Sequence, residues 1–201
     1  MVKIGMIGMS PGNAHPYSWS SIVNGTYDAS EIIRVGYPGV ADYLVANKDT
    51  LGFNNARVTH LWTQNRATSQ SIARSAGIKN IVDDLSVMVS EVDAVILARD
   101  DAEHHVEMAK PFLDNGIPIF IDKPLAISRK DLLWFTEQDS KSKFLMSCSS
   151  MRYATECRAL KAELATLGKI ILVTAVGKKD WLKYGVHMLE AVFSLLDDPI
   201  P

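Results

Sequence analysis

The sequence has few cysteines, no excess of positive charge and no long apolar run. Its only two cysteines, Cys148 and Cys157, have no Cys/His cluster at zinc-finger spacing around them, so we expect ordinary thiols, no disulfide and no metal site. The 21 Lys and Arg against 23 Asp and Glu leave a net charge of -2, without the basic excess typical of proteins that bind nucleic-acid phosphates. These absences argue against a zinc-finger protein and against a nucleic-acid partner.

No segment approaches the ~18 uncharged apolar residues that a membrane-spanning helix needs. The first residues, Met1 to Gly8, also lack the apolar region and small-residue cleavage site of a signal peptide. We therefore expect a cytoplasmic protein with no membrane partner. With 47% hydrophobic and 22% charged residues, the chain can form the core of one globular domain and a small second unit.

Apolar, β-rich runs alternate with helical patterns along the chain. The expected strands are Val2–Ile7, Arg57–Thr63, Lys79–Val82, Asp93–Ala98, Ile117–Ile121 and Phe144–Ser147. The expected helices are Ser69–Ala76, Leu85–Val89, Ala102–Asn115, Ser128–Gln138, Glu156–Leu167 and Val186–Leu196. This alternation predicts an α/β fold with a doubly wound parallel sheet that helices cover on both faces. Small polar residues at 147–150 predict a boundary between a first domain, 1–150, and a second unit, 151–201.

The turn after the first strand, Gly8-Met9-Ser10-Pro11-Gly12-Asn13-Ala14-His15, lies where a doubly wound fold points a helix N-terminus at a pyrophosphate. Gly8 suits the tight turn, and Ser10 stands where a second glycine would let the backbone approach phosphate. Gly12 and Asn13 tolerate unusual backbone dihedrals. Because a plain Gly/Pro/Asn loop explains the same residues, the turn alone leaves both interpretations open.

A longer pattern is more specific. The strand Asp93–Ala98, a helix with His105 near its start and Gly116 at its end, and Asp122-Lys123-Pro124 after the next strand resemble the Gfo/Idh/MocA family of oxidoreductases. Asp122 stands where that family has Glu. The resemblance continues in three further segments, Met151-Arg152-Tyr153, Leu167-Gly168-Lys169-Ile170 and Gly185-Val186-His187. It covers the chain end to end, with a poor match from Pro16 to Ala56.

The resemblance implies a Rossmann domain that binds NAD or NADP, followed by the beginning of an α+β substrate domain, here incomplete. It also implies hydride transfer to or from a sugar-like or cyclitol-like alcohol or ketone. The candidate cofactor-binding residues are Gly8, Ser10, Gly12, Asn13, Thr63, Asn65, Arg66, Ala98, Arg99, Asp100, Asp122 and Lys123. We expect a small-molecule substrate and a homo-oligomer.

Lys123 and His187 are the candidate catalytic residues that the resemblance implies. Oxidising a secondary alcohol needs a proton acceptor with a pKa near neutrality and a positive group on the developing alkoxide, and His and Lys supply these. Each residue also has a plainer explanation, Lys123 as a solvated charge and His187 as a residue that opens an apolar helix. Many family members carry Asp four residues before this histidine, where this chain has Lys183. Either Asp180 or Glu190 substitutes, or the chemistry differs.

The end of the second expected strand bears on the choice of dinucleotide. NAD-selective Rossmann domains present Asp or Glu there to the ribose 2′-hydroxyl, whereas NADP sites offer hydroxyls and a cation. The run Trp62-Thr63-Gln64-Asn65-Arg66 holds no acid, and Arg66 is available to a 2′-phosphate, so the sequence favours NADP over NAD. The alternative is a solvated Arg66 that begins a helix.

Roughly forty residues separate the first turn from the second strand, more than a single crossover helix needs. This insertion is rich in aromatic residues and proline, namely Pro16, Tyr17, Trp19, Tyr27, Tyr37, Pro38 and Tyr43. Such a set suits either stacking on a sugar ring or packing into a compact loop. The sequence leaves both open.

Two other functions remain open from the sequence. The first is a non-catalytic module that binds a dinucleotide; Lys183 and the early end at Pro201 favour it. The second is an NAD-dependent glycoside hydrolase of the same family. Family members normally continue well past the helix that holds the histidine. We therefore expect a chain that binds cofactor, self-associates through the apolar stripe of helix Val186–Leu196 and turns over little by itself.

Overall fold

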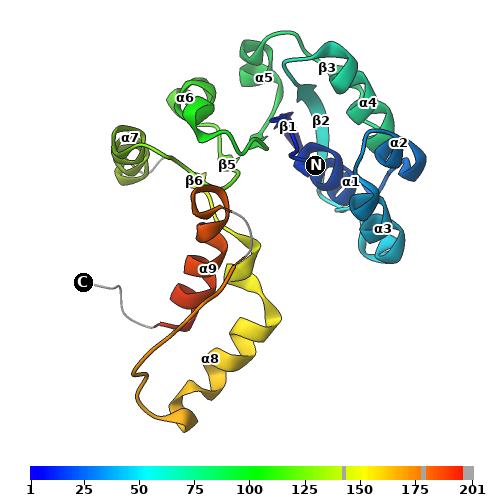
Figure 1. Ribbon diagram of the computed structural model, residues 1–201. Coiled ribbons are helices and arrows are strands. Elements are labelled where there is room, and N and C mark those ends of the chain that lie inside the picture. The colour runs from blue at the N-terminus through cyan, green and yellow to red at the C-terminus, as the bar shows by residue number, and fades with distance from the viewer. Residues whose placement is uncertain (142–143, 178–179, 197–201) are drawn as a thin grey trace.

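The computed structural model describes residues 1–141, 144–177 and 180–196, which contain one six-stranded parallel sheet (Figure 1). The strands are β1 Val2–Ile7, β2 Ala56–Trp62, β3 Asn80–Ile81, β4 Ala94–Leu97, β5 Ile119–Ile121 and β6 Leu145–Met146. They lie in the order β3-β2-β1-β4-β5-β6, which is the arrangement of a doubly wound sheet. The predicted fold class and the six predicted strands are confirmed.

Helices connect the strands and continue beyond the sheet. They are α1 His15–Asn24, α2 Ala29–Arg34, α3 Pro38–Ala46, α4 Arg66–Ala76, α5 Leu85–Glu91, α6 His105–Asp114, α7 Arg129–Ser140, α8 Thr155–Leu167 and α9 Trp181–Leu195, with short 3-10 turns at Lys48–Thr50, Ala102–His104 and Ser150–Tyr153. Two helices begin three or more residues earlier than predicted. The Asn65 side chain accepts a hydrogen bond from the Thr68 backbone, so α4 starts at Arg66. Asp180 caps α9 in the same way, so His187 lies inside that helix and does not open it.

Each face of the sheet has its own apolar core. Successive side chains of a strand point to opposite faces, so neighbours in β1 enter different cores. Met6 packs with α1, α3 and α4, whereas Ile7 packs with α5, α6 and α7. In β4 the same alternation sends Val95 and Leu97 to the second core and Ile96 to the first. The sheet is therefore covered on both faces, as predicted.

The end of α6 confirms a prediction made from one glycine. Gly116 has a φ of +70°, a conformation that L side chains rarely adopt. It lets the Ile117 backbone N–H donate to the carbonyl oxygen of Phe112 at 2.9 Å. This closes the helix and sends the chain directly into β5.

The insertion between α1 and β2 folds into α2, α3 and a 3-10 turn that pack beside α1 and α4 (Figure 1). Tyr17 is buried and donates a hydrogen bond to the Ser71 hydroxyl at 2.8 Å, and the rings of Tyr17 and Tyr37 lie 5.9 Å apart. These contacts support the packing interpretation for Tyr17, Tyr27 and Tyr37. Trp19 differs, because its indole stacks on His15.

The part of the chain after β6 projects away from the sheet (Figure 1). α9 packs against α8 and against the 3-10 turn at Ser150–Tyr153. Between α8 and α9 the described residues 168–177 form no strand, and Ile171 and Val176 are 94% and 93% exposed. Among the described residues, no helix has both the length and the apolarity to cross a membrane.

Candidate functional site

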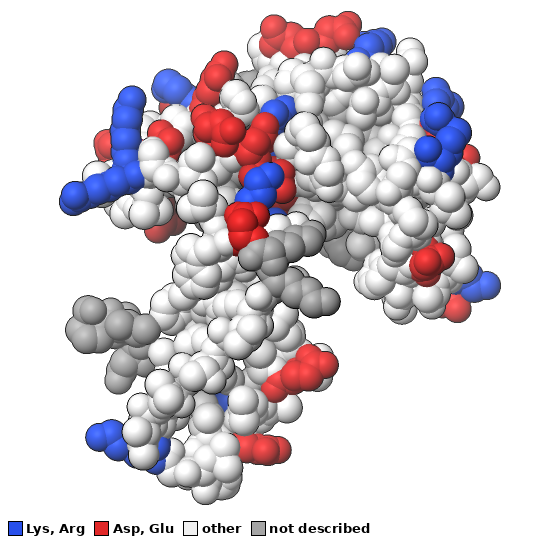
Figure 2. Space-filling model, viewed as in Figure 1, with Lys and Arg blue, Asp and Glu red and all other residues white. Residues whose placement is uncertain are grey.

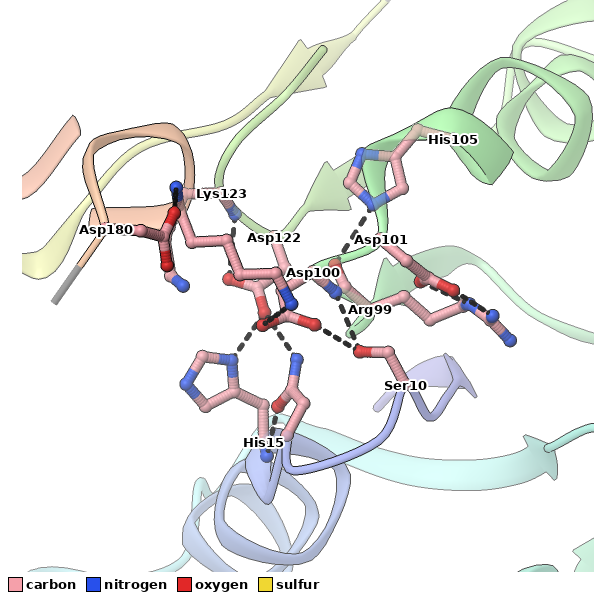
Figure 3. Close-up of polar contacts among 11 residues, drawn as sticks. Ser10, His15, Arg99, Asp100, Asp101, His105, Asp122, Lys123 and Asp180 are labelled. Atoms are coloured by element: carbon pink, nitrogen blue, oxygen red, sulfur yellow. Dashed lines mark hydrogen bonds and ion pairs between the residues drawn. The ribbon is translucent and has the colours of Figure 1, made fainter. Parts of the chain in front are cut away.

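The loops that follow β1, β4 and β5 meet at the carboxyl edge of the sheet (Figure 3). Ligands of open α/β sheets bind at this edge, where the strand order reverses between β1 and β4. Ser10 and Asn13 of the first loop donate to Asp100 and Asp122, which belong to the loops after β4 and β5. Segments far apart in the sequence therefore build one polar site.

The turn after β1 offers free backbone donors. Among the described residues, the N–H groups of Ser10, Gly12 and Ala14 donate to no acceptor, although they immediately precede α1. Gly8 is required by close packing, because a Cβ at this position would lie 2.4 Å from Cγ of Pro16. Gly12 has a φ of +79° with open space around it. Free N–H groups ahead of a helix form an anion-binding concavity, so this turn fits a pyrophosphate.

The polar side chains of this turn are held by carboxylates. Ser10 donates its hydroxyl hydrogen to Asp100 and accepts from the Asp100 backbone at 3.1 Å. Asn13 donates from Nδ2 to Asp122 at 3.0 Å. The other oxygen of Asp100 lies 3.4 Å from the Lys183 ammonium of α9, which offsets the negative charge beside the turn. Figure 2 shows acidic and basic side chains side by side in a band that runs from the sheet toward α9.

The end of β2 also contacts the turn. Gln64 accepts a hydrogen bond from the Met9 backbone at 3.1 Å and another from Arg99 at 3.1 Å. Arg99 is buried and pairs with Asp101, with Nε 2.8 Å from Oδ1. Arg99 is thus engaged within the protein, although its backbone, like that of Ala98, lies beside the site. Its neighbour Asp100 is the residue that reaches the turn.

Three further predicted cofactor residues lie at this strand end, but they make local contacts. Thr63 is buried and donates to the carbonyl oxygen of Asn65 at 2.7 Å. Arg66 begins α4 and pairs with Asp83 at 2.6 Å, with side chains 54% and 87% exposed. Such an exposed ion pair is weak. The guanidinium of Arg66 therefore remains available to an anion.

Arg34 is a further cation near the turn after β1, and the sequence did not suggest it as a site residue. A cavity of about 300 Å³ opens beside Met9 and is lined by Arg34, Tyr37 and Thr68, among others. Arg34 makes a bidentate pair with Glu31, and its hydrogen bonds, with one from Ser71, lower the pKa of Glu31 to about 2. Arg34 comes from the insertion, whose sequence gave no signal of contact with the first turn.

His105 links two loops of the site. One ring nitrogen lies 3.0 Å from the carbonyl oxygen of Leu125, and the other lies 3.0 Å from that of Arg99. Burial lowers the pKa of His105, although both carbonyl contacts oppose that change. This histidine therefore holds the loops after β4 and β5 together and stays outside the cavity described next.

Lys123 and His187, the two predicted catalytic residues, line the same cavity of about 330 Å³. The cavity lies beyond β5 and β6, and its remaining lining residues are His15, Trp19, Phe120, Asp122, Met146, Cys148, Ser149, Ser150 and Tyr153. Apolar and aromatic residues therefore line part of the cavity, together with cationic, imidazole and hydroxyl groups. This composition is typical of a small-molecule site.

Lys123 is a buried cation in this cavity. It follows Asp122 at the end of β5, and its ammonium lies 5.2 Å from the centre of the Tyr184 ring. The ring face of an aromatic side chain attracts such a cation. The interpretation of Lys123 as a solvated surface charge is therefore wrong, because the side chain is almost completely excluded from water.

His187 lacks the carboxylate partner that its motif led us to expect. Its Nδ1 lies 2.6 Å from the hydroxyl of Ser149. Burial lowers the pKa of His187, and the nearby Lys123 ammonium lowers it further. Asp180 instead caps α9, and Glu190 instead binds Arg152 through both of its oxygens at 2.5 and 2.7 Å. Neither acid takes the place of the missing aspartate.

The carboxylate of this cavity belongs to a different histidine. Asp122 is buried, and its Oδ2 lies 2.5 Å from Nδ1 of His15, while its Oδ1 accepts from the Lys123 backbone at 2.8 Å (Figure 3). Asp122 is a predicted cofactor residue, whereas His15 stood only at the end of the first turn with no predicted role. The signal that was available is the four-residue spacing of His15 and Trp19, which places both on one face of a helix.

Comparisons with known proteins agree with this fold. The model of an oxidoreductase family with an NAD-binding Rossmann fold, Gfo/Idh/MocA, matches residues 2–141. YceM of Salmonella typhimurium, a candidate oxidoreductase, is 29% identical over 167 residues, which cover 82% of this chain and 51% of YceM. The chain thus spans about half the length of that relative.

Two solved structures show the same fold. Myo-inositol dehydrogenase from Lactobacillus casei, solved with NAD(H) and myo-inositol, has a TM-score of 0.59 and 19% identity, over 83% of this chain and 42% of that one. A Gfo/Idh/MocA family oxidoreductase from Vibrio cholerae has a TM-score of 0.58 and 23% identity, over 83% of this chain and 44% of that one.

Proposed function

The chain belongs to the Gfo/Idh/MocA oxidoreductase family, and on that premise we propose that it binds a nicotinamide dinucleotide at the turn after β1 and that Lys123 and His187 act on an alcohol or ketone beside it. The observation that carries this proposal is the shared cavity, which brings Lys123 from the end of β5 and His187 from α9 to one place. Asp122 joins the two parts of the site, because it holds Asn13 of the turn and the backbone of Lys123.

Each residue has a stated part in this proposal. A bound nicotinamide supplies the hydride donor or acceptor. The Lys123 ammonium stabilises the negative charge that develops on the reacting oxygen, and its burial strengthens that interaction. His187 contacts the same oxygen from α9. Trp19, Phe120 and Met146 exclude water from the reacting atoms.

The proposed substrate is a sugar-like or cyclitol-like polyol. The cavity combines an aromatic wall with several hydrogen-bonding groups, which suits the apolar face and the hydroxyl edge of such a ring. The Lactobacillus casei relative, which was solved with myo-inositol, adds support by analogy. Because the chain spans about half the length of YceM, this substrate class is proposed for the cavity that the chain itself forms.

We propose NADP as the preferred dinucleotide. No carboxylate follows β2 in the run Thr63-Gln64-Asn65-Arg66. Two acids near this corner, Glu31 and Asp83, are already paired with Arg34 and Arg66. Arg66→Ala and Arg34→Ala, each titrated with NADPH and with NADH by cofactor fluorescence, test this. We expect about a fivefold or greater loss for NADPH and little change for NADH, because only NADPH carries the 2′-phosphate. Equal losses for both cofactors in both variants would contradict the assignment.

The domain boundary and the oligomer are part of the proposal. Residues 1–150 form the nucleotide-binding domain, and residues 151–201 form the beginning of a substrate domain. Exposed apolar side chains on α9, Trp181, Leu182 and Phe193, support self-association into a homo-oligomer. Sedimentation over a range of concentrations checks this, and a monomer at the highest concentration contradicts it.

One observation favours a second function, a non-catalytic module that binds the dinucleotide. Lys183 stands where many family members have an acid beside the histidine, and it pairs with Asp100. Fluorescence titration of NADPH and NADH, followed by a screen of polyols for absorbance change at the nicotinamide band, separates the two functions. Turnover of any polyol supports the oxidoreductase; binding without turnover supports the module. A chain that binds neither cofactor would contradict both functions.

A further inference from the structure

The cavity that contains Lys123 and His187 also contains a second imidazole. His15, the first residue of α1, lines it and lies beside Asp122, with 2.5 Å between Nδ1 and Oδ2. Asp122 is buried, whereas about a third of the His15 side chain is exposed. A buried carboxylate behind an imidazole that faces a cavity is the arrangement of a general acid–base group.

The hydrogen bonds around Asp122 fix which nitrogen of His15 carries the proton. Oδ1 accepts from the Lys123 backbone at 2.8 Å, and Oδ2 accepts from Nδ2 of Asn13 at 3.0 Å. Both oxygens of Asp122 thus already act as acceptors, and the same role toward His15 makes the imidazole the donor. Nδ1 of His15 therefore carries the hydrogen of this contact, and a neutral ring has its lone pair on Nε2.

The His15 ring is also fixed in orientation. The indole of Trp19 stacks on it at 4.2 Å with an interplanar angle of 12°. The His15 backbone N–H donates to Oδ1 of Asn13 at 2.8 Å, which anchors the start of α1 to the same network. Within the described residues, Nε2 has no hydrogen-bond partner. Two contacts thus fix the ring, the Trp19 stack and the Asp122 carboxylate, and its acceptor nitrogen remains available to a ligand.

His187 is placed differently. Its Nδ1 contacts the hydroxyl of Ser149, which is a neutral group. The same hydroxyl accepts a hydrogen bond from the Met151 backbone at 3.1 Å. Lys123 disfavours a positive charge on this ring. His187 therefore suits a neutral hydrogen-bonding role, whereas His15 lies directly against a buried carboxylate.

We propose that His15, oriented by Asp122, is the acid–base residue of this cavity, and that His187 binds the reacting substrate as a neutral imidazole. This inference rests on the proposed oxidoreductase function. In the oxidation of a secondary alcohol, the O–H bond breaks and its proton passes to Nε2 of His15. The C–H bond breaks, its electron pair leaves as hydride to the oxidised nicotinamide cofactor, and the carbonyl bond forms. In reduction His15 returns the proton.

The first test observes the imidazole nitrogens of the full chain by isotope-edited NMR, with resonances assigned from His15→Gln and His187→Gln. We expect neutral His15 to carry its hydrogen on Nδ1, and Asp122→Asn to reduce that preference, because the variant keeps the size of the side chain and removes its charge. Adding myo-inositol to the chain with NADPH bound should shift the Nε2 resonance of His15. This readout requires no turnover.

The second test is kinetic. His15→Gln should lower kcat by about a hundredfold and change KM by less than about threefold, because the lost interaction is made during proton transfer. Imidazole added to His15→Ala should restore part of the rate, which it would not do if the side chain only supported the fold. His104→Gln, which removes an exposed imidazole outside the cavity, is the matched control and should leave kcat unchanged.

The outcomes separate this inference from the proposed function. If myo-inositol shifts His187 and leaves His15 unchanged, or if imidazole gives no rescue in an active enzyme, His15 is not the acid–base residue and the oxidoreductase proposal stands. If neither histidine responds to a series of polyols in a chain that binds NADPH, the cavity is not the substrate site. That result would contradict both the role of His15 and the proposed oxidoreductase function. Failure to bind NADPH or NADH overturns the proposed function itself.

Discussion

The sheet-bearing part of the chain and the part after β6 are stabilised in different ways, although both contribute to the site. Met6, Leu97 and Phe112 are fully buried in cores on the two faces of the sheet. In contrast, α8 has no buried residue, and Gly185 is the one buried residue of α9. α9 is nevertheless the helix that supplies His187 to the cavity.

Polar contacts attach α9 to the rest of the site. His187 contacts Ser149, and Lys183 contacts Asp100. Partly exposed ion pairs contribute about 0–1 kcal/mol each, whereas a fully buried apolar side chain contributes roughly 1.5–3 kcal/mol. The proposed cofactor side of the site is therefore built on the sheet core. The proposed substrate side depends on contacts that a single substitution or a change of pH can weaken.

The largest expected effect tests this difference directly. Phe112→Ala in the core beneath β4 and β5 should lower the free energy of unfolding by about 3–5 kcal/mol, because it leaves a cavity in a fully buried site. The matched change in the other part is Leu160→Ala in α8, where the side chain is 39% exposed. It should cost about 0.5 kcal/mol. Urea unfolding followed by circular dichroism measures both, and similar losses would mean that α8 is as well packed as the sheet.

Lys123→Ala separates catalysis from cofactor binding. In a form that turns over substrate, we expect a loss of about a hundredfold in kcat with cofactor affinity nearly unchanged, because the ammonium acts on the reacting oxygen. Lys130→Ala, an exposed lysine at the start of α7, is the control and should change neither quantity. A Lys123→Ala chain that fails to fold would instead assign the buried lysine a structural role.

Much of the sheet could be predicted from sequence because buried parallel strands have a strong local signal. The run Ala94-Val95-Ile96-Leu97 is apolar on both faces, and Gly116 marks the helix end before β5. The match of the family model confirms the resemblance inferred from the motif around Asp122 and Lys123. These features depend on residues close together in the chain, so a local sequence pattern is enough to predict them.

The partners of the catalytic candidates could not be predicted, because they come from distant segments. Nothing in the sequence around His187 points to Ser149, and nothing around Asp122 points to His15 across more than a hundred residues. The start of α9 was also not predicted. Asp180 caps this helix, so it begins at Trp181 and His187 lies inside it. Such pairings arise from tertiary packing, which a local pattern does not record.

Gly12→Val tests whether the turn after β1 binds the cofactor. Gly12 has a φ of +79° in the turn that faces the proposed pyrophosphate, so a branched side chain strains the backbone and blocks the approach of the ligand. We expect at least a tenfold loss of NADPH affinity, measured by fluorescence titration. Gly116→Val, at a similar φ of +70° on the far side of α6, is the control for strain alone. It should destabilise the fold to a similar extent and leave affinity in the folded fraction unchanged.

The smallest expected effect concerns pH and compares one histidine from each part. Burial lowers the pKa of both His105, in α6, and His187, in α9, so the unfolded chain takes up protons at a higher pH than the folded chain does. The unfolding free energy should therefore fall as the pH drops below about 6.5, the ordinary histidine value, by at most about 1.4 kcal/mol per pH unit for each residue.

The stabilising contribution of each neutral imidazole is fully present above that pH and is lost progressively below it. His187→Gln removes one of the two titrations, so its stability should decline less steeply than that of the parent between pH 6.5 and 5.5. The remaining decline reflects His105, with a further part from His60, whose pKa burial also lowers. Urea unfolding at a series of pH values measures the slopes. Identical slopes for the parent and the variant would show that His187 is as accessible to protons in the folded chain as in the unfolded one, and that α9 does not hold it against Ser149 in solution.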